Sequence, residues 1–398
     1  MDSSNKGAAA NKPSILQTSN LRNVTQQVFY NLLYSMVKNN DLPMKAAVFL
    51  TILEDIQLFS FAWDPQFGFG SAIPGWVVAF FAPINSMVSL SYFGFVITFC
   101  FVFILITTAV LFIVVCGIFF HKGRFTAIWP LHVLRGLTTF ITTVMLLSLL
   151  EFLTAAIACT HVDENGNSGY LTMFPEIHCF RSSHIVVFVL TIVTLAVFMP
   201  FVITIVLVYI DPMPFPRGHD EWNALSRAHG RIDFVYVLIR IALAFLFAFT
   251  GTSLQVIKQS IACVLFGCLT ILYINYQPLY MPLMNQLRSG FLAATTVSCF
   301  IAAVTSSIPN VNGTAAFIAL CCSTLPSFAA GFFLAEYYQR RLREGIYQRI
   351  RKKFQAKKII EISSLQGDQL GEKEMIAVAS AKREREIKVN ISFAMIMD

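Results

Sequence analysis

Long uninterrupted apolar stretches dominate the hydrophobic pattern of the chain, and shorter polar segments separate them. A helix that crosses a bilayer needs about 20 mostly apolar residues. The pattern predicts eight such helices, at 44–63, 92–120, 127–159, 184–210, 231–249, 254–274, 288–306 and 315–338. We therefore expect an all-α polytopic membrane protein. The first stretch is the least apolar, because it carries Glu54 and Asp55, and a helix lying in the membrane interface is the alternative there.

The composition agrees with this fold class. Of the 398 residues, 56% are hydrophobic and only 13% are charged, whereas a soluble domain carries about 25% charged residues. A soluble globule of this size could not bury so much apolar surface. The composition therefore excludes a soluble enzyme, a disordered chain and a secreted disulfide scaffold. The continuous apolar stretches also exclude a transmembrane β-barrel, whose strands alternate in polarity.

The distribution of basic residues predicts the orientation. Of 29 lysines and arginines, 25 fall on one side of the eight predicted helices, Arg181 falls on the other, and three lie inside. Basic loops face the cytosol, so we expect both termini in the cytosol. We expect the protein itself in the plasma membrane or an endomembrane. The chain then divides into a polar cytosolic arm (1–43), a membrane domain (44–338) and a basic amphipathic tail (339–398). We interpret the tail as the start of a larger cytosolic region.

The predicted non-cytosolic loops carry two modification signals. Cys159 and Cys179 flank a polar loop on the oxidising side, which predicts a disulfide. Two unpaired thiols are the alternative. The sequence Asn312-Gly313-Thr314 is an acceptor site for N-glycosylation and falls on the same side. We expect a glycan at Asn312, although the site lies close to the membrane.

Six ionisable residues within the predicted spans are candidate site residues. They are Glu54, Asp55, Arg135, Glu151, Asp233 and Arg240. A charge inside the bilayer costs about 2.5–3.5 kcal/mol, so these groups normally face protein or water. One interpretation is a permeation or substrate path lined by Glu54, Asp55, Arg135 and Arg240. The other is that the charges join helices or anchor their ends.

Arg240 lies about ten residues inside the stretch 231–249, too deep to reach the interface easily. Asp233 is two helical turns nearer the cytosol on the same face. We expect this face to be buried and Arg240 to pair with an acidic or backbone partner on a neighbouring helix. The opposite face, with Leu238 and Ala242, then faces lipid or a less polar seam.

The tail begins with a strongly basic segment, in which 340–358 holds nine basic residues and one acid. Apolar residues recur there every four positions, at Leu342, Ile346, Ile350 and Phe354, which predicts an amphipathic helix along the inner leaflet. The expected partners are the bilayer and its anionic lipids, and no nucleic acid. The alternatives are calmodulin binding and an ordinary positive-inside stop signal. The candidate lipid-binding residues are Arg340, Arg341, Arg343, Arg349, Arg351, Lys352 and Lys353.

Motifs of known catalytic sites are missing from the sequence. There is no phosphate-binding glycine loop and no His-Glu-x-x-His motif, and the seven histidines are scattered without metal-ligand spacing. His219, Asp220 and Glu221 form an acidic cluster that a solvated loop explains. We therefore expect no enzyme, no catalytic or metal site and no cofactor, and the sequence leaves open whether the chain is a homo-oligomer.

Two passages carry a resemblance to a known family. They are 221–223 with 229–240, which follow the Asp211-Pro212 exit from the fourth span, and the basic run 337–341. They resemble the N-terminal membrane region of the protist and fungal proteins related to tiny macrocysts proteins B and C, over roughly 25–360. In that family, helical repeats and often PAS-type sensor domains follow.

The resemblance implies a role in sensing or signalling at a membrane, without a known reaction, and no catalytic residue can be transferred. Because the chain stops before the repeats, we interpret it as a truncated form of a longer protein. The leading hypothesis is thus a non-enzymatic membrane module of a sensor or signalling protein. The alternative is an ion channel or transporter whose path the intramembrane charges line.

Overall fold

The structure is a computed structural model that describes residues 44–64, 67–69, 72–81, 91–121, 129–159, 169–208, 230–250, 254–308 and 311–365. The predicted N-terminal arm, the His219–Glu221 cluster and the tail beyond residue 365 lie outside these residues.

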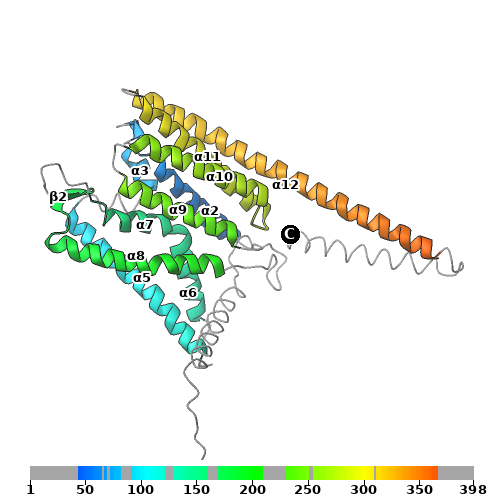
Figure 1. The fold of residues 1–398 in the computed structure, drawn as a ribbon, viewed down its shortest axis with the longest axis horizontal. Coiled ribbons are helices and arrows are strands. Elements are labelled where there is room, and N and C mark those ends of the chain that lie inside the picture. The colour runs from blue at the N-terminus through cyan, green and yellow to red at the C-terminus, as the bar shows by residue number, and fades with distance from the viewer. Residues whose placement is uncertain are drawn as a thin grey trace, which may run out of the picture.

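Helices make up nearly all of the described chain, in agreement with the all-α prediction (Figure 1). The helices are α2 (Met44–Ile56), the 3-10 helix η1 (Gln57–Phe61), α3 (Gly75–Phe81), α5 (Tyr92–His121), α6 (Trp129–Thr139), the π-helical turn η4 (Phe140–Val144), α7 (Leu146–Ala155), α8 (Ser182–Val208), α9 (Arg231–Phe249), α10 (Gln255–Tyr276), α11 (Pro282–Ser307) and α12 (Gly313–Leu365). The strands β1 (Tyr170–Leu171) and β2 (Phe174–His178) pair as an antiparallel hairpin.

Within the described residues, six helices are long and apolar enough to cross a membrane. They are α5, α8, α9, α10, α11 and α12, and α6 with α7 adds a seventh if the bent pair is one span. These seven correspond to seven of the eight predicted spans. The remaining one, 44–63, is formed by α2 and η1, with 13 and 5 residues. Helices α11 and α12 are longer than the predicted spans, since α11 begins at Pro282 and α12 continues to Leu365.

The predicted span 127–159 is broken instead of being one long helix. The two halves around η4 are bent by 64°. Threonine hydroxyls donate to the carbonyl four residues earlier at this point, Thr142 to Thr138 at 2.8 Å and Thr143 to Thr139 at 2.6 Å. Such bonds and π-helical turns are known causes of helix bending. The excess length of this stretch is therefore accommodated partly by a bend.

The segment formed by α2 and η1 runs along most of α11. At its start, Ala47 packs with Met281 and Met284 at the beginning of α11. Beyond its end, the carbonyl of Phe67 accepts a hydrogen bond of 2.7 Å from Thr305, near the end of α11. Although α2 and η1 are short, the segment 44–67 thus covers the same distance as a helix long enough to cross a membrane.

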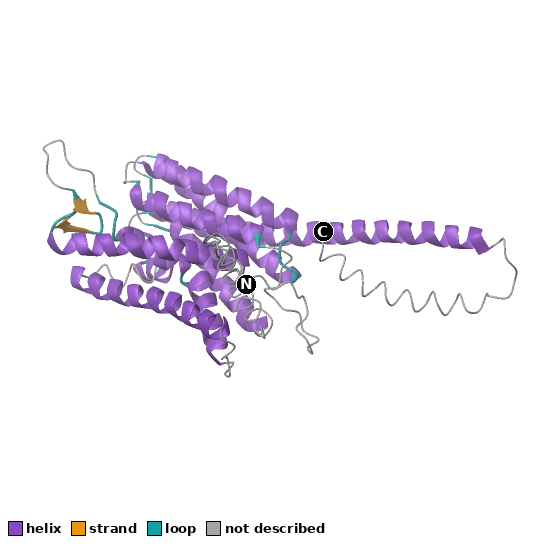
Figure 2. Ribbon diagram, turned by 60° about the horizontal axis from the view of Figure 1, so that its bottom comes forward, coloured by secondary structure: helices purple, strands orange, loops and turns teal. Residues whose placement is uncertain are grey.

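The two ends of the bundle differ. Figures 1 and 2 show the β1–β2 hairpin at the same end as the connection between α11 and α12, and the C-terminal part of α12 projecting beyond the opposite end. Helix α12 has 53 residues, or about 80 Å at a rise of about 1.5 Å per residue. Its first half packs in the bundle, against α11 and α10.

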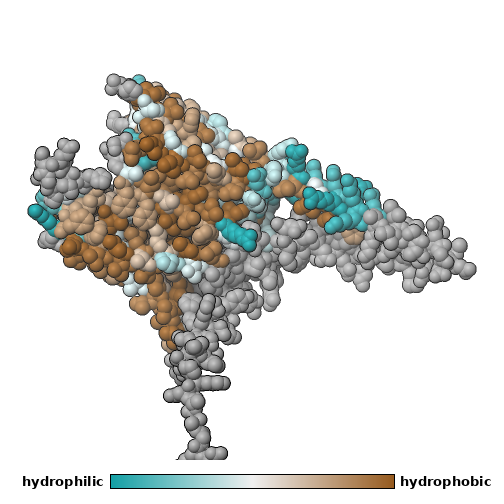
Figure 3. Space-filling view, in the orientation of Figure 1, coloured by the Kyte–Doolittle hydropathy of each residue, from teal (hydrophilic) through white to brown (hydrophobic). Residues whose placement is uncertain are grey.

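The surface of the bundle is apolar, whereas the projecting part of α12 is hydrophilic (Figure 3). Large apolar side chains such as Phe93, Phe101 and Leu325 are more than two-thirds exposed. A soluble domain would not expose so many of them together. Exposed apolar helices of this length are compatible with a protein embedded in a membrane.

Candidate functional site

A network of buried polar side chains joins four helices in the interior of the bundle. Helix α2 contributes Glu54 and Asp55, α9 contributes Asp233, Tyr236 and Arg240, α10 contributes Tyr273, and α11 contributes Arg288. Each of these residues is at most 5% exposed. The network therefore sits where charge is costly and where partners must compensate it.

Glu54 lies at the centre, between two arginines. Arg240 donates from Nη1 to Glu54 Oε1 at 2.8 Å, and Arg288 donates from Nη2 to Glu54 Oε2 at 2.6 Å. Each carboxylate oxygen thus has its own guanidinium, from α9 and α11 respectively. Charge-assisted bonds of this kind are about twice as strong as neutral ones, so Glu54 fixes α9 and α11 relative to α2.

Arg288 also faces two further carboxylates. Its Nη1 lies 3.4 Å from Asp233 Oδ1 and 3.2 Å from the hydroxyl of Tyr273. Its Nε lies 3.5 Å from Asp55 Oδ1. One arginine of α11 therefore contacts side chains of α2, α9 and α10.

Two tyrosines complete the network. Tyr236 donates its hydroxyl to Asp55 Oδ1 at 2.9 Å, and Tyr273 donates to Asp233 Oδ1 at 3.1 Å. The guanidinium carbons of Arg240 and Arg288 lie 5.3 and 5.0 Å from the ring centre of Tyr236. These are cation–π distances, so the Tyr236 ring contributes to holding both cations in an apolar interior.

The local sequence of α9 explains how its polar groups meet. Asp233, Tyr236 and Arg240 recur at helical spacing and share one face. That face is buried, whereas Leu238 and Ala242 on the opposite face are exposed. Arg240 therefore points into the protein and away from the apolar surface.

The structure brings together four of the six predicted charges. Glu54, Asp55, Asp233 and Arg240 are in the network, whereas Glu151 on α7 accepts a hydrogen bond of 2.8 Å from Ser60 of η1. Arg135 is part of α6, and its side chain lies outside what the structure describes.

Sequence reasoning missed Arg288, Tyr236 and Tyr273. The predicted span 288–306 starts at Arg288, which puts this residue at the membrane interface, but α11 begins nearly two turns earlier, with Pro282 at its N-terminus. Proline in the first turn is a recognised start signal, and it would have placed Arg288 inside the helix. The tyrosines gave no comparable signal, because aromatic residues are frequent throughout the spans.

A second set of polar contacts anchors η1 to its neighbours. Gln57 donates to the carbonyl of Val144 at 2.6 Å, and Gln259 of α10 donates to the carbonyl of Phe61 at 2.5 Å. Together with the bond between Ser60 and Glu151, these contacts tie the end of the first segment to η4, α7 and α10. Buried polar groups of the first segment are thus largely paired.

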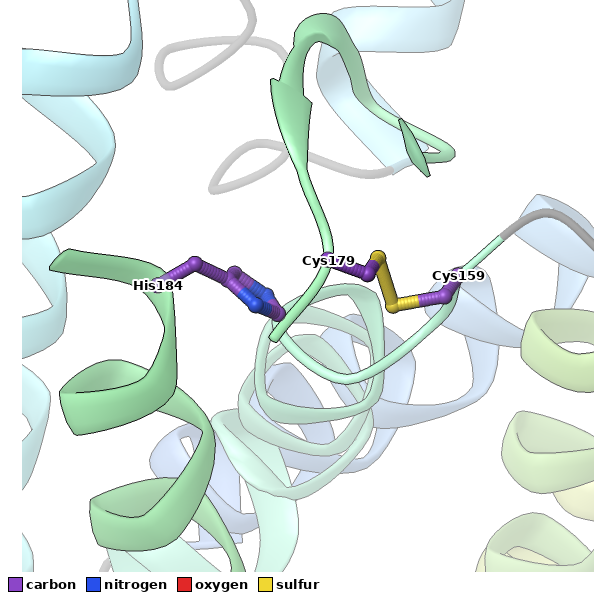
Figure 4. A group of neighbouring side chains, drawn as sticks. All are labelled: Cys159, Cys179 and His184. Carbon is purple, nitrogen blue, oxygen red and sulfur yellow. A yellow bond between two sulfur atoms is a disulfide. The ribbon is translucent and has the colours of Figure 1, made fainter. Parts of the chain in front are cut away.

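At the hairpin end, the predicted disulfide between Cys159 and Cys179 is confirmed (Figure 4). His184 lies beside it and is buried. Its Nδ1 accepts the backbone N–H of Phe180 at 3.3 Å, so its Nε2 donates to the carbonyl of Ala156 at 3.2 Å. Both ring nitrogens of His184 are hydrogen-bonded and both sulfurs form the disulfide. These three residues therefore stabilise the hairpin end of the bundle and are not placed as metal ligands.

Asn312 and the basic tail lie at the surface. Asn312 is exposed, and its Oδ1 caps α12 by accepting the N–H of Thr314 at 3.1 Å. The glycan at this residue stays a prediction. The seven basic residues predicted to bind lipid are all exposed on the projecting part of α12. Arg340 forms an ion pair with Glu336, one turn earlier on the same helix.

Two curated proteins of Dictyostelium discoideum are similar to the chain. Tiny macrocysts protein C is 25% identical over 328 residues, which cover 80% of this chain and 22% of that protein. Tiny macrocysts protein B is 24% identical over 321 residues, which cover 78% of this chain and 21% of that protein. No protein-family model and no solved structure matches. The chain is therefore similar to the tiny macrocysts proteins, as its sequence predicts, and spans about a fifth of their length.

Proposed function

We propose that the chain is the non-enzymatic membrane module of a sensor or signalling protein, with eight membrane crossings and both ends in the cytosol. The observation that carries this proposal is the continuity of α12. One unbroken helix packs in the bundle and then projects from it as an exposed basic helix. A change inside the bundle can therefore reach the outside through a single rigid element.

The path from the buried network to α12 runs through α11. Arg288 connects α11 to α2 and α9. Directly after Arg288, α11 meets α12 at small residues, where a Cβ on Gly331 would lie 2.6 Å from Ala293 Cβ and from the carbonyl of Ser289. Contact this close leaves little room for sliding. A shift of α11 would therefore move α12.

The first segment supports eight crossings. It extends from the start of α11 at Ala47 to the end of α11 at Phe67. With this segment counted, the start of α2 and the projecting part of α12 fall at one end of the bundle. The split of basic residues favours the cytosol for that end.

We propose that the projecting helix contacts anionic lipids of the inner leaflet through its exposed arginines and lysines. Each basic residue near such a surface contributes about 1 kcal/mol. Because α12 continues straight out of the bundle, Arg340, Arg341 and Arg343 lie nearest to the membrane. Lys352 and Lys353 reach it only if the helix bends, and Gly345, where an added Cβ would meet no atom within 4 Å, lies between the two groups.

A distance measurement tests the transmission. Spin labels at Tyr276 and Gln355, both exposed, would report how α12 lies relative to the end of α10. Replacement of Arg288 by Lys in the labelled full chain should shift or broaden the distance distribution, since the fork of hydrogen bonds is lost. Ala242→Leu on the exposed face of α9 is the matched control. An unchanged distribution in Arg288→Lys would contradict the proposed path.

The alternative is an ion channel or transporter, and one observation favours keeping it. Glu151 interacts electrostatically with both Arg240 and Asp64, so the buried network has further charged neighbours. Ion flux into liposomes containing the purified chain separates the two functions. A conducting path requires flux that Arg240→Leu abolishes, whereas the signalling module gives no flux above empty liposomes.

A further inference from the structure

The two acidic residues of α2 are adjacent in sequence but differ in how they are compensated. Glu54 has a guanidinium on each oxygen, at 2.8 and 2.6 Å. Asp55 is fully buried and receives a hydrogen bond from the hydroxyl of Tyr236 at 2.9 Å. Arg288 Nε lies 3.5 Å away from its Oδ1 without forming a hydrogen bond. The ion pair of Asp55 with Arg288 is therefore weaker than the two ion pairs of Glu54.

The second oxygen of Asp55 differs from the first. Its Oδ2 is buried and accepts no hydrogen bond from the part of the chain that the structure describes. A buried ionised carboxylate normally accepts several donors or pairs with a cation, because transfer of a bare charge from water is very unfavourable. An ionised Asp55 would have only one hydrogen bond and one ion pair of 3.5 Å, both on the same oxygen, which is less compensation than Glu54 receives. A neutral carboxylic acid needs less compensation than a buried charge.

Within the described residues, the cations around Asp55 donate their hydrogen bonds to other groups and none to Asp55. Arg240 donates to Glu54, and Arg288 divides its donors between Glu54, Asp233 and the hydroxyl of Tyr273. Asp233 has further interactions, so the comparison that decides is between the two adjacent carboxylates of α2. In a low-dielectric interior, two neighbouring carboxylates disfavour each other's ionisation, and the one with fewer donors takes the proton.

We propose that the network is a proton-binding site and that Asp55 carries the bound proton on Oδ2 at neutral pH. One O–H bond forms with a proton taken from water, and no other bond changes. The acidic and cationic groups that face the site are Glu54 of α2, Asp233, Tyr236 and Arg240 of α9, Tyr273 of α10 and Arg288 of α11. The site exists whether or not the membrane module signals, so it can fail independently of the proposed function.

Release of this proton places an uncompensated negative charge where α2 meets α9 and α11. An unfolded chain loses the same proton near about pH 4, the ordinary value of aspartate. Above that pH, the folded protein holds one proton more than the unfolded chain. Its stability must then fall as pH rises, by up to about tenfold in the unfolding equilibrium per pH unit, until Asp55 ionises in the folded state as well.

Thermal unfolding of the full chain in detergent, between about pH 5 and about pH 8, tests the site with matched variants. Asp55→Asn mimics the protonated acid and should fold with good yield. The difference in unfolding temperature between this variant and the wild type should change with pH. Glu54→Gln likewise replaces a carboxylate by an amide, at the adjacent residue. It should strongly reduce folded yield, because it leaves Arg240 and Arg288 without their shared anion.

Infrared spectroscopy of the wild type supplies a readout that needs no stable variant. The carbonyl band of a protonated carboxylic acid should be present at neutral pH and should disappear at high pH, and Asp55→Asn should lack it. Three results would overturn the proposal: no such band in the wild type, a pH dependence that Asp55→Asn leaves unchanged, or stabilisation of the wild type by sodium or potassium at constant pH, which would assign a metal cation to the site.

Discussion

Glu54 joins parts of the chain that are far apart in sequence, since its two arginines follow it by 186 and 234 residues. Ion pairs in an apolar interior are favourable only when both partners are present and well oriented. Here each oxygen of one carboxylate meets a separate guanidinium, and the ring of Tyr236 lies against both. The loss of either arginine would leave one oxygen of this buried carboxylate without its guanidinium.

Replacement of Arg240 by Leu should therefore lower folded yield and reduce stability by about 3–5 kcal/mol, the range for breaking a buried ion pair. Ala242→Leu should be nearly neutral, because Ala242 is exposed on the opposite face of α9. Thermal unfolding in detergent measures both variants. Equal stability of Arg240→Leu and wild type would mean that the ion pair with Glu54 contributes nothing to the fold.

Individual residues also show where sequence reasoning succeeds and where it stops. The depth of Arg240 and the spacing of Asp233 on one helix suffice to expect a buried face, since both follow from helical geometry. The partner of Arg240 does not follow, because Glu54 and Asp55 were equivalent candidates and only the packing of α2 against α9 selects one. Arg288 was missed because a start of the helix six residues too late put it at the interface.

At the scale of the elements, α11 and α12 owe their contact to two glycines. A Cβ on Gly290 would lie 2.9 Å from the ring of Phe328, and one on Gly331 would collide with the backbone of α11. Without a hydrophobic driving force between helices in lipid, such close packing is a main source of attraction. The contact therefore determines how firmly the projecting helix is held.

Gly331→Leu should separate α12 from α11 and destabilise the protein by about 1–3 kcal/mol, the range for overpacking. Gly345→Ala is the matched control in the same helix. It meets no atom within 4 Å and should be neutral or slightly stabilising, because alanine favours helix by about 1 kcal/mol over glycine. Unfolding in detergent tests the pair, and a harmless Gly331→Leu would show that the two helices can separate without consequence.

The disulfide between Cys159 and Cys179 fastens the hairpin loop to the end of α7. For a sequence separation of 20, the chain-entropy model gives a stabilisation of about 3 kcal/mol. Replacement of both cysteines by Ala should lower the unfolding temperature, and a reductant should then have no further effect. In the wild type, a thiol reagent should label more cysteines after reduction than before; equal labelling would count against the bond in the expressed protein.

Elements were predicted well where apolar stretches are uniform, and less well where polar side chains interrupt them. The helices α5, α8, α9 and α10 fall close to the predicted ranges. A continuous apolar stretch in lipid forms a helix, because only then are all its backbone N–H and C=O groups hydrogen-bonded within the segment. The bend at η4 was not predicted. It depends on threonines whose hydroxyls bond within the helix, and threonine is common in helices that stay straight.

At the scale of the whole molecule, the bundle is apolar outside and charged inside, the reverse of a soluble domain. The predicted topology makes this arrangement testable. Reporter domains fused after residue 45 and after residue 360 should both score as cytosolic, since the start of α2 and the projecting part of α12 lie at the same end of the bundle (Figure 1). Opposite locations would show that the first segment does not cross.

The separation of Glu54 from its partners has a consequence for biosynthesis. In the proposed eight-crossing arrangement, α2 leaves the ribosome first with two carboxylates, each costing about 2.5–3.5 kcal/mol in the membrane. At about 5–20 residues per second, Arg240 and Arg288 follow roughly 10–50 s later. The first segment would therefore pack into the bundle late, after α9 and α11 have been synthesised and can supply its ion-pair partners. Nascent chains ending at residue 230 should leave a cysteine at position 51 open to a water-soluble reagent, whereas chains ending at residue 308 should protect it.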